Sequence, residues 1–449
     1  VIPGFVEGHG HLMGYGEAQL NLNLATAKNL GELVAQVAEA VDKAEPGEWI
    51  LGRGWHQSKW NETPKMVDGF QTNETLNGIS PDNPVYLKHA SGHAAFVNDR
   101  ALAIAGIDEK TQVAGDGEII RDPSGRATGV LNERAQNLVS RFVPALSRSQ
   151  RERALDLALE GLARVGITSF QDAGASQDDI RLYQAFLNED RLTTRVYAMI
   201  TGGDSDMLAD WMQRGPLIGA GDDKLTVRSI KLVADGALGS RGAWLLEPYS
   251  DRAGHSGLPT MPVAEMSDIS HLAYRNGFQV AIHAIGDRAN REVLDIFDAL
   301  FDGRDRGVRF RVEHAQHLHP EDIPRFGQLG VIPSMQGIHM SSDRPWAIDR
   351  LGAERIASGA YMWKSLIESG AVLVNGTDVP VEPVNPFASY YALVTRMTLA
   401  GYPEGGFEPS ERLNRETALK TYTINPAFGA FEEALKGSLE PGKVADFIV

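Results

Sequence analysis

The sequence of 449 residues contains no cysteine, so the protein can form no disulfide bond and offers no thiolate to a metal ion. Any metal ion must therefore be bound by histidine, by a carboxylate or by a modified side chain. The absence of cysteine is compatible with the cytoplasm, and we expect a cytoplasmic protein. The chain begins at Val1 without methionine, so a signal peptide preceding it is also compatible with the sequence.

Basic residues are fewer than acidic ones, with 43 lysines and arginines against 59 aspartates and glutamates and a net charge of −16. Nucleic-acid binding depends on clustered Lys and Arg, so this balance argues against a nucleic-acid partner. The sequence also lacks an uncharged apolar run near the roughly 18 residues that a membrane-spanning helix needs. We therefore expect a soluble protein that acts on a small molecule, without a membrane partner, and a homodimer as the softer expectation.

The first twelve residues form a short apolar run that ends in two histidines, His9 and His11. In a β-strand alternate residues face the same side, so both imidazoles should point the same way at the end of this strand. Imidazole nitrogen is a favoured ligand of zinc and of several other divalent metals. The pair therefore indicates one half of a metal site.

Seven further segments read as strands, and amphipathic helical patterns separate most of them. They are residues 167–171, 194–200, 225–233, 278–282, 308–312, 331–334 and 371–375. Eight strands alternating with helices predict an α/β protein with a (β/α)₈ TIM barrel, whose active sites lie at the carboxyl ends of the strands. A doubly wound sheet would show the same alternation.

Residues 46–132 interrupt this alternation with short, irregular pieces rich in Trp, Gly, Pro and Asn. We interpret them as an inserted α+β subdomain between the first part of the barrel, residues 1–45, and its remainder, residues 133–435. An amphipathic helix at residues 29–44 is assigned to the first part of the barrel. The last residues read as a strand cut in mid-course, so we expect the chain to be a fragment.

Polar residues follow the predicted strands where the chain would reach the mouth of the barrel. Lys231 lies in the fourth strand, His283 follows the fifth, His314 follows the sixth, and Asp378 follows the eighth. All four should converge with the histidine pair of the first strand. No structural role that these residues would share explains the pattern, which therefore predicts a metal site.

Several longer motifs carry a resemblance to a known family. They are PGFVEGHGH, GRGWHQSKW, GHAAFVN, GITSFQDAG, IKLVADGALGSRGA, AIHAIGDRA, VEHAQHL and NGTDVPVEPVNPF. Together they resemble the amidohydrolase superfamily and, within it, the branch of YtcJ-like proteins and N-substituted formamide deformylases (amidohydrolase family 3). The closing residues, 436–449, look like this family's return into a β-sandwich, which would be largely missing here.

The resemblance implies a metal-dependent hydrolase of C–N bonds with one or two divalent ions. His9 and His11 would bind one ion, His283 and His314 a second, and Asp378 would be both a ligand and a proton shuttle. Such ions lower the pKa of water toward ~7 and polarise a carbonyl group, so that hydroxide attacks at neutral pH. The carboxylate would take a proton from that water and return it to the departing amine.

Lys231 would bridge the two ions as a carbamate formed with carbon dioxide, because a carbamate offers two anionic oxygens and an ammonium offers none. The alternative is an ordinary salt-bridged lysine beside a single metal ion. Zinc is the expected metal, and iron, manganese, cobalt and nickel suit the same ligands.

Five further residues are candidates for substrate binding. They are His93, Trp55, Arg241, Gln336 and His339. The two from the insertion would cover the pocket, and Arg241 would bind a substrate carbonyl or carboxylate or else hold its own loop. For Gln336 and His339, as for Gln171, Asp172 and Gln316, hydrogen bonding to metal ligands is the alternative role.

The expected substrate is a small amide, N-formyl or cyclic amide. A mononuclear deaminase or an esterase on the same scaffold is the alternative, although such deaminases typically lack the lysine and carry a Glu soon after the fifth-strand histidine, where this chain has Ala284-Ile285-Gly286-Asp287. A non-catalytic binding protein would have lost ligands, and none is lost. The family's Gly-Trp-Asp appears here as Gly54-Trp55-His56, so an acidic role there is in doubt.

Overall fold

Eight parallel strands in the computed structural model form the barrel that the sequence predicts. They are β2 (Phe5–Gly10), β11 (Ile167–Ala175), β12 (Arg195–Thr201), β14 (Leu225–Val233), β15 (Gln279–Ala284), β16 (Arg311–His314), β17 (Ile332–Met335) and β18 (Val374–Asn375). The order in the sheet is β18-β17-β16-β15-β14-β12-β11-β2. Every predicted strand is present and the (β/α)₈ fold is confirmed. The short β13 (Leu217–Gly219) adds an antiparallel neighbour to β14.

The first and last strands of the barrel are joined at their carboxyl ends. The Asp378 amide donates to the His9 carbonyl at 2.9 Å, and the His11 amide donates to the Val379 carbonyl at 2.8 Å. This approach requires glycine, because a Cβ at Gly8 would lie 2.4 Å from the carbonyl oxygen of Asn375. The closure therefore brings residues from opposite ends of the sequence to one mouth.

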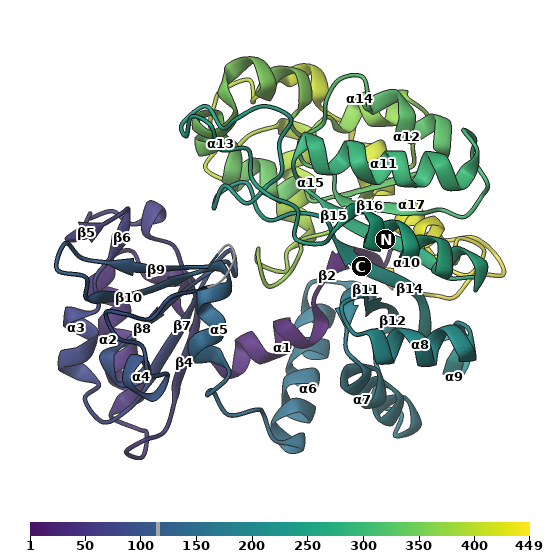
Figure 1. Cartoon of the computed structure of the whole chain (residues 1–449). Helices are drawn as coiled ribbons and strands as arrows, with labels where there is room; N and C mark the ends of the chain where they lie inside the picture. Colours follow the sequence, from purple (N-terminus) through teal and green to yellow (C-terminus); the bar gives the residue numbers. More distant parts are fainter. Residues whose placement is uncertain (114–116) are drawn as a thin grey trace. The chain divides into compact units, whose positions relative to one another are not determined.

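Helices surround these strands, and their buried residues explain why. They are α7 (Gln177–Asn188), α8 (Ser205–Arg214), α10 (Val263–Arg275), α11 (Asp287–Phe301), α12 (Ile323–Leu329), α13 (Gly337–Gly359), α14 (Trp363–Glu368), α15 (Pro386–Thr395), α16 (Arg415–Lys420) and α17 (Ile424–Gly429). In α11, for example, Val293, Phe297 and Phe301 recur at helical spacing and are buried. Figure 1 shows α11 and α12 outside β15 and β16.

The structure describes residues 1–113 and 117–449, in two compact units. The barrel unit comprises Val1–Leu12 and Ala158–Val449, and the second unit comprises Met13–Leu157. The predicted insertion, residues 46–132, lies inside the second unit, whose bounds are wider. The reason is visible in α2 (Leu30–Val41), because its Leu33 and Val37 belong to the second unit's own core.

The second unit is built around a six-stranded sheet. The order of its strands is β3 (Leu22–Asn23), β4 (Ile50–Trp55), β7 (Val85–His89), β8 (Ala94–Val97), β10 (Ala127–Asn132) and β9 (Glu118–Arg121). Its other helices include α3 (Glu74–Ile79) and α4 (Asp99–Ile104), and its core includes Trp55, Leu87 and Phe96.

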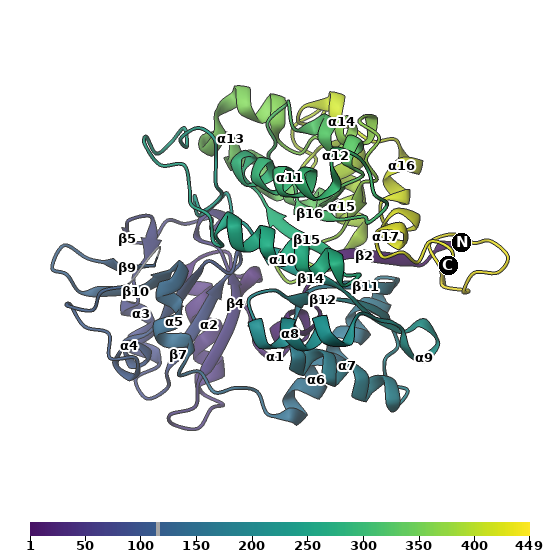
Figure 2. The ribbon, with the colours of Figure 1, turned by 45° about the vertical axis from the view of Figure 1, so that its right-hand side comes forward.

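The two termini of the chain lie side by side in both ribbon views (Figure 2), where β1 (Ile2–Pro3) pairs antiparallel with β19 (Phe447–Ile448). Among the described helices, none combines the length and the apolar character needed to cross a bilayer.

Candidate metal centre

Three predicted ligands meet at the carboxyl end of the barrel. His9 lies in β2, His314 ends β16, and Asp378 follows β18; one ligand atom of each lies within 4.8 Å of those of the other two. All three side chains are buried, and the imidazole rings of the two histidines are 4.8 Å apart. Asp378 has a φ of 58°, so the chain turns sharply after β18 and directs it to this point.

The other two predicted histidines adjoin this group. The Nε2 atom of His11 is 3.2 Å from Oδ1 of Asp378, and the ring of His283 is 4.5 Å from that of His314. We call His9, His11, His283, His314 and Asp378 the histidine–aspartate cluster.

Lys231 lies in β14 and is 8% exposed. Burial lowers the pKa of its amine from the usual value, while the carboxylates of Glu313 and Asp378 act in the opposite direction. A larger fraction of Lys231 than of an exposed lysine is therefore present as the neutral amine. The two carboxylates also place Lys231 in the electrostatic field of the cluster.

The cluster fits a divalent metal ion. Burial lowers the pKa of His9, and it lowers that of His314 to about 3, so both imidazoles are neutral near pH 7. Among the described residues, none forms a hydrogen bond with the buried Nε2 atom of His9. Burial alone would raise the pKa of Asp378, but the hydrogen bond from His11 opposes it, and the pKa lies well below its usual range. Neutral imidazoles beside an ionised carboxylate are the donor set that such an ion requires.

Glu313, which the sequence pattern did not single out, contacts the cluster through His9. It is fully buried, and its Oε2 atom lies 2.5 Å from Nδ1 of His9. Burial alone would raise its pKa, but the charge of Arg311 and the hydrogen bonds from His9 and Arg311 outweigh burial and lower it. A signal was present, because Arg311 and Glu313 are opposite charges two residues apart in one strand and so face the same side.

Asp235, also missed, lies 3.4 Å from Nε2 of His283 through its Oδ1 atom. Three backbone amides donate to its carboxylate, those of Trp244, Ile285 and Gly286. Burial raises its pKa to about 7 despite these hydrogen bonds. In the sequence, the feature that could have indicated Asp235 as a residue of the site is its position four residues after Lys231.

Gln336 and His339 both reach the cluster. The amide oxygen of Gln336 lies 2.7 Å from Nδ1 of His314, a contact of the kind that the alternative role, hydrogen bonding to a metal ligand, requires. His339, in α13, has its Nε2 atom 3.8 Å from Oδ2 of Asp378. His339 therefore adjoins the cluster.

The remaining polar residues near the strand ends have partners of their own. Asp172 accepts hydrogen bonds from the Leu12 amide and the Tyr183 hydroxyl, and so fixes the residue after His11. Gln171 accepts a hydrogen bond from Arg311, and Gln316 donates to the Tyr361 hydroxyl at 2.8 Å.

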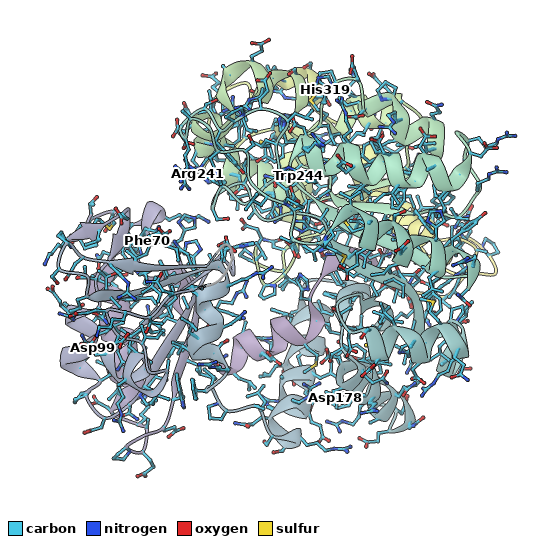
Figure 3. The ribbon with its side chains drawn as sticks, in the orientation of Figure 1. Phe70, Asp99, Asp178, Arg241, Trp244 and His319 are labelled. Carbon is cyan, nitrogen blue, oxygen red and sulfur yellow. The ribbon has the colours of Figure 1, made fainter. Side chains whose placement is uncertain are left out.

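Arg241 is held by its own loop. Its guanidinium donates two hydrogen bonds to the carboxylate of Asp251, at 3.1 and 2.9 Å. Figure 3 labels it together with Trp244, further along the loop that follows β14. A substrate carboxylate would have to compete with Asp251 for this side chain.

His93 and Trp55 belong to the second unit. Trp55 is fully buried and its indole N–H donates to the Leu87 carbonyl at 2.8 Å, which is a packing arrangement. Nδ1 of His93 is 2.9 Å from a carboxylate oxygen of Glu133. Burial lowers the pKa of His56, next to Trp55, to about 4. His56 is therefore neutral near pH 7 and lacks the negative charge of an aspartate.

Comparison with known proteins identifies the class. The model of the amidohydrolase family matches residues 1–449, so the chain belongs to this family. Within it, the chain is 35% identical to LONG AFTER FAR-RED 3 of Arabidopsis thaliana, over all of this chain and 77% of that protein. It is 31% identical to YtcJ of Bacillus subtilis (strain 168) and 27% identical to N-substituted formamide deformylase of Arthrobacter pascens, in each case over all of this chain and 83% of the relative.

A solved structure shares the fold over nearly the whole chain. It is an uncharacterized metal-dependent hydrolase from Pyrococcus horikoshii OT3, with a TM-score of 0.79 and 29% identity over 99% of this chain and 84% of that one. The family and the shared fold together support the conclusion that the protein is a hydrolase, and His9, His314 and Asp378 are its candidate site for a divalent metal. The predicted membership of the YtcJ and formamide deformylase branch is confirmed.

Proposed function

We propose that the protein is a metal-dependent amidohydrolase that cleaves a non-peptide C–N bond of a small molecule, in an amide, N-formyl or cyclic amide group. The observation that carries the proposal is the convergence of His9, His314 and Asp378, with ligand atoms within 4.8 Å of one another, in a member of the amidohydrolase family. The similarity to an N-substituted formamide deformylase supports the choice of bond.

The histidine–aspartate cluster would hold one or two divalent ions, with zinc the best match to its imidazole nitrogens. A bound ion would lower the pKa of water and polarise the substrate carbonyl. Lys231 supports a second ion, because its buried amine can react with carbon dioxide. In that step an N–C bond forms and a proton leaves, which gives a carbamate with two anionic oxygens.

Asp378 is the proton carrier in this proposal. Its carboxylate is ionised near pH 7, so it can accept a proton from the attacking water. It then donates that proton to the leaving nitrogen, which departs as a neutral amine. His339, 3.8 Å from the second oxygen of Asp378, would contact the substrate on this side.

The test combines elemental analysis with a substrate panel. The purified protein should contain one or two equivalents of a divalent metal and should release amine from an N-formyl, N-acyl or cyclic amide compound. Chelation should abolish that activity and zinc should restore it. His314→Ala should lose metal and activity, and His271→Ala, which alters an exposed histidine of α10, should keep both. Activity confined to esters or to deamination would replace the proposal by the alternative.

A further inference from the structure

A chain of buried hydrogen bonds leads from Arg311 through Glu313 to His9, and all three side chains are fully buried. The Nε atom of Arg311 donates to Oε1 of Glu313 at 2.6 Å, and its Nη2 atom donates to Oε2 at 3.1 Å. The same Oε2 atom lies 2.5 Å from Nδ1 of His9.

This arrangement determines which nitrogen of His9 carries the hydrogen. An ionised carboxylate only accepts hydrogen bonds, so Nδ1 of His9 must be the donor to Glu313. In a neutral imidazole the other nitrogen is then bare. Nε2 of His9 therefore presents a lone pair, and it lies 3.6 Å from Oδ1 of Asp378.

Arg311 also fixes the backbone beside His9. Its Nη2 atom donates to the Gly8 carbonyl at 2.7 Å and to the Ser334 hydroxyl at 2.8 Å. One guanidinium therefore holds Glu313, β2 and β17 in a fixed relation. A buried carboxylate without such a cation would be costly, and rotation of the His9 ring would break the hydrogen bond to Glu313.

The surroundings of His314 and His11 differ from those of His9. His314 has a neutral amide oxygen, that of Gln336, at 2.7 Å from its Nδ1 atom. The side chain of His11 is 40% exposed and its Nε2 atom faces Asp378. A carboxylate beside an imidazole makes it a more basic ligand than a neutral amide does. His283 also has a carboxylate, with Oδ1 of Asp235 at 3.4 Å from its Nε2 atom, but the contact of 2.5 Å between Glu313 and His9 is much closer, so His9 has the strongest support in the cluster.

We propose that Glu313, held by Arg311, is a positioning residue that fixes the Nδ1–H tautomer of His9. As a result, the first equivalent of metal binds at His9. The inference rests on the proposed metal-dependent function. It assigns Arg311 and Glu313 no contact with substrate, because they act through His9.

The first test reads the tautomer directly in the full-length, metal-free protein. Ring nitrogen shifts of ¹⁵N-labelled histidine, assigned with a His9→Gln variant, should show hydrogen on Nδ1 of His9. Hydrogen on Nε2 in the wild type would overturn the inference without any variant. This readout does not involve activity, so it separates the inference from the proposed function.

The second test measures zinc affinity by competition with a chelator. Glu313→Gln keeps the size of the side chain and removes its charge, and it should weaken binding of the first equivalent roughly 10–100-fold. Arg311→Lys keeps a positive charge but loses the paired N–H donors of the guanidinium, and it should weaken zinc binding less than Glu313→Gln. If Glu313→Gln fails to fold, Arg311→Lys takes its place in the test. Glu368→Gln, an exposed change in α14, should match the wild type.

The outcomes separate the two proposals. If the wild type and a folded Glu313→Gln or Arg311→Lys variant bind zinc with the same affinity, Arg311 and Glu313 form only a structural ion pair. The inference about His9 would then fail, and the proposed function would stand. A wild type that binds neither zinc nor another divalent metal would defeat the proposed function as well. Retained folding is checked by circular dichroism of each variant.

Discussion

The Nε2 atom of His11 lies 3.2 Å from the Oδ1 atom of Asp378, where the end of the first barrel strand meets the residues that follow the last. The backbone of the same two stretches is hydrogen-bonded, from Asp378 to His9 and from His11 to Val379. The contacts that close the barrel therefore also bring the residues of the site together. A change that opened this seam would be expected to disturb both.

Replacing Asp378 by Asn should reduce turnover more than metal content. The amide keeps the size and one ligand oxygen of the carboxylate but cannot accept a proton, and general acid–base steps are worth about 10²–10⁴-fold. The measurement is turnover number beside elemental analysis of the same sample. Asp349→Asn, an exposed change in α13, should behave as the wild type. Near-full activity of Asp378→Asn would move the shuttle to another residue.

Replacing Lys231 by Ala should lower metal content and activity together, because the bridging oxygens of the carbamate are lost. A small carboxylic acid added to the variant should partly restore both, since its two oxygens can occupy the space of the carbamate. Lys364→Ala, an exposed change in α14, is the matched control. Two metal ions and full activity in Lys231→Ala would contradict the bridge and favour a one-metal mechanism.

The barrel could be predicted because each of its strands is a short apolar run that stands out from its flanks. The strand-end position of His9, His283 and His314 followed from the same pattern, since the carboxyl ends of parallel strands share one edge. The boundaries of the second unit did not follow. The helix α2 has the same amphipathic pattern as a barrel helix, and only its packing partners, such as Trp55, show where it belongs.

Glu313 shows a different limit of the sequence. Neighbouring residues of a strand point to opposite faces, so Glu313 and His314 would not be expected at one site. His314 has a φ of 74° and Ala315 a φ of 40°, so the strand turns at its end and both side chains reach the cluster. A periodic pattern cannot reveal such a turn. Arg241 is similar, because the sequence could not show that Asp251 holds it.

Trp55 should contribute to stability through packing. It is fully buried, and truncating a buried Trp to Ala typically costs about 3–5 kcal/mol. We expect Trp55→Ala to lower the free energy of unfolding by this order in urea denaturation, with Tyr402→Ala, 64% exposed, near the wild type. Trp55→Phe should leave KM unchanged if the role is packing alone. A large rise in KM with unchanged stability would instead support the predicted substrate contact.

The stability of the protein should depend on pH through His56. Burial, and to a smaller extent Lys59, lowers the pKa of His56 from 6.5 to about 4. Between about pH 6.5 and about pH 4, the histidine is protonated in the unfolded chain and neutral in the folded protein. The free energy of unfolding therefore decreases as the pH is lowered through this window, by on the order of 2–3 kcal/mol. Buried acids such as Glu7, whose pKa burial raises to about 8, act in the opposite direction, because the folded state then holds the extra proton.

The contributions of those other groups cancel when the wild type is compared with His56→Gln. Urea denaturation at pH 7, 5.5 and 4.5 should therefore show a steeper loss for the wild type than for His56→Gln, whereas His271→Gln, with an exposed histidine, should follow the wild type. Parallel curves for wild type and His56→Gln would show that His56 titrates normally in the folded protein.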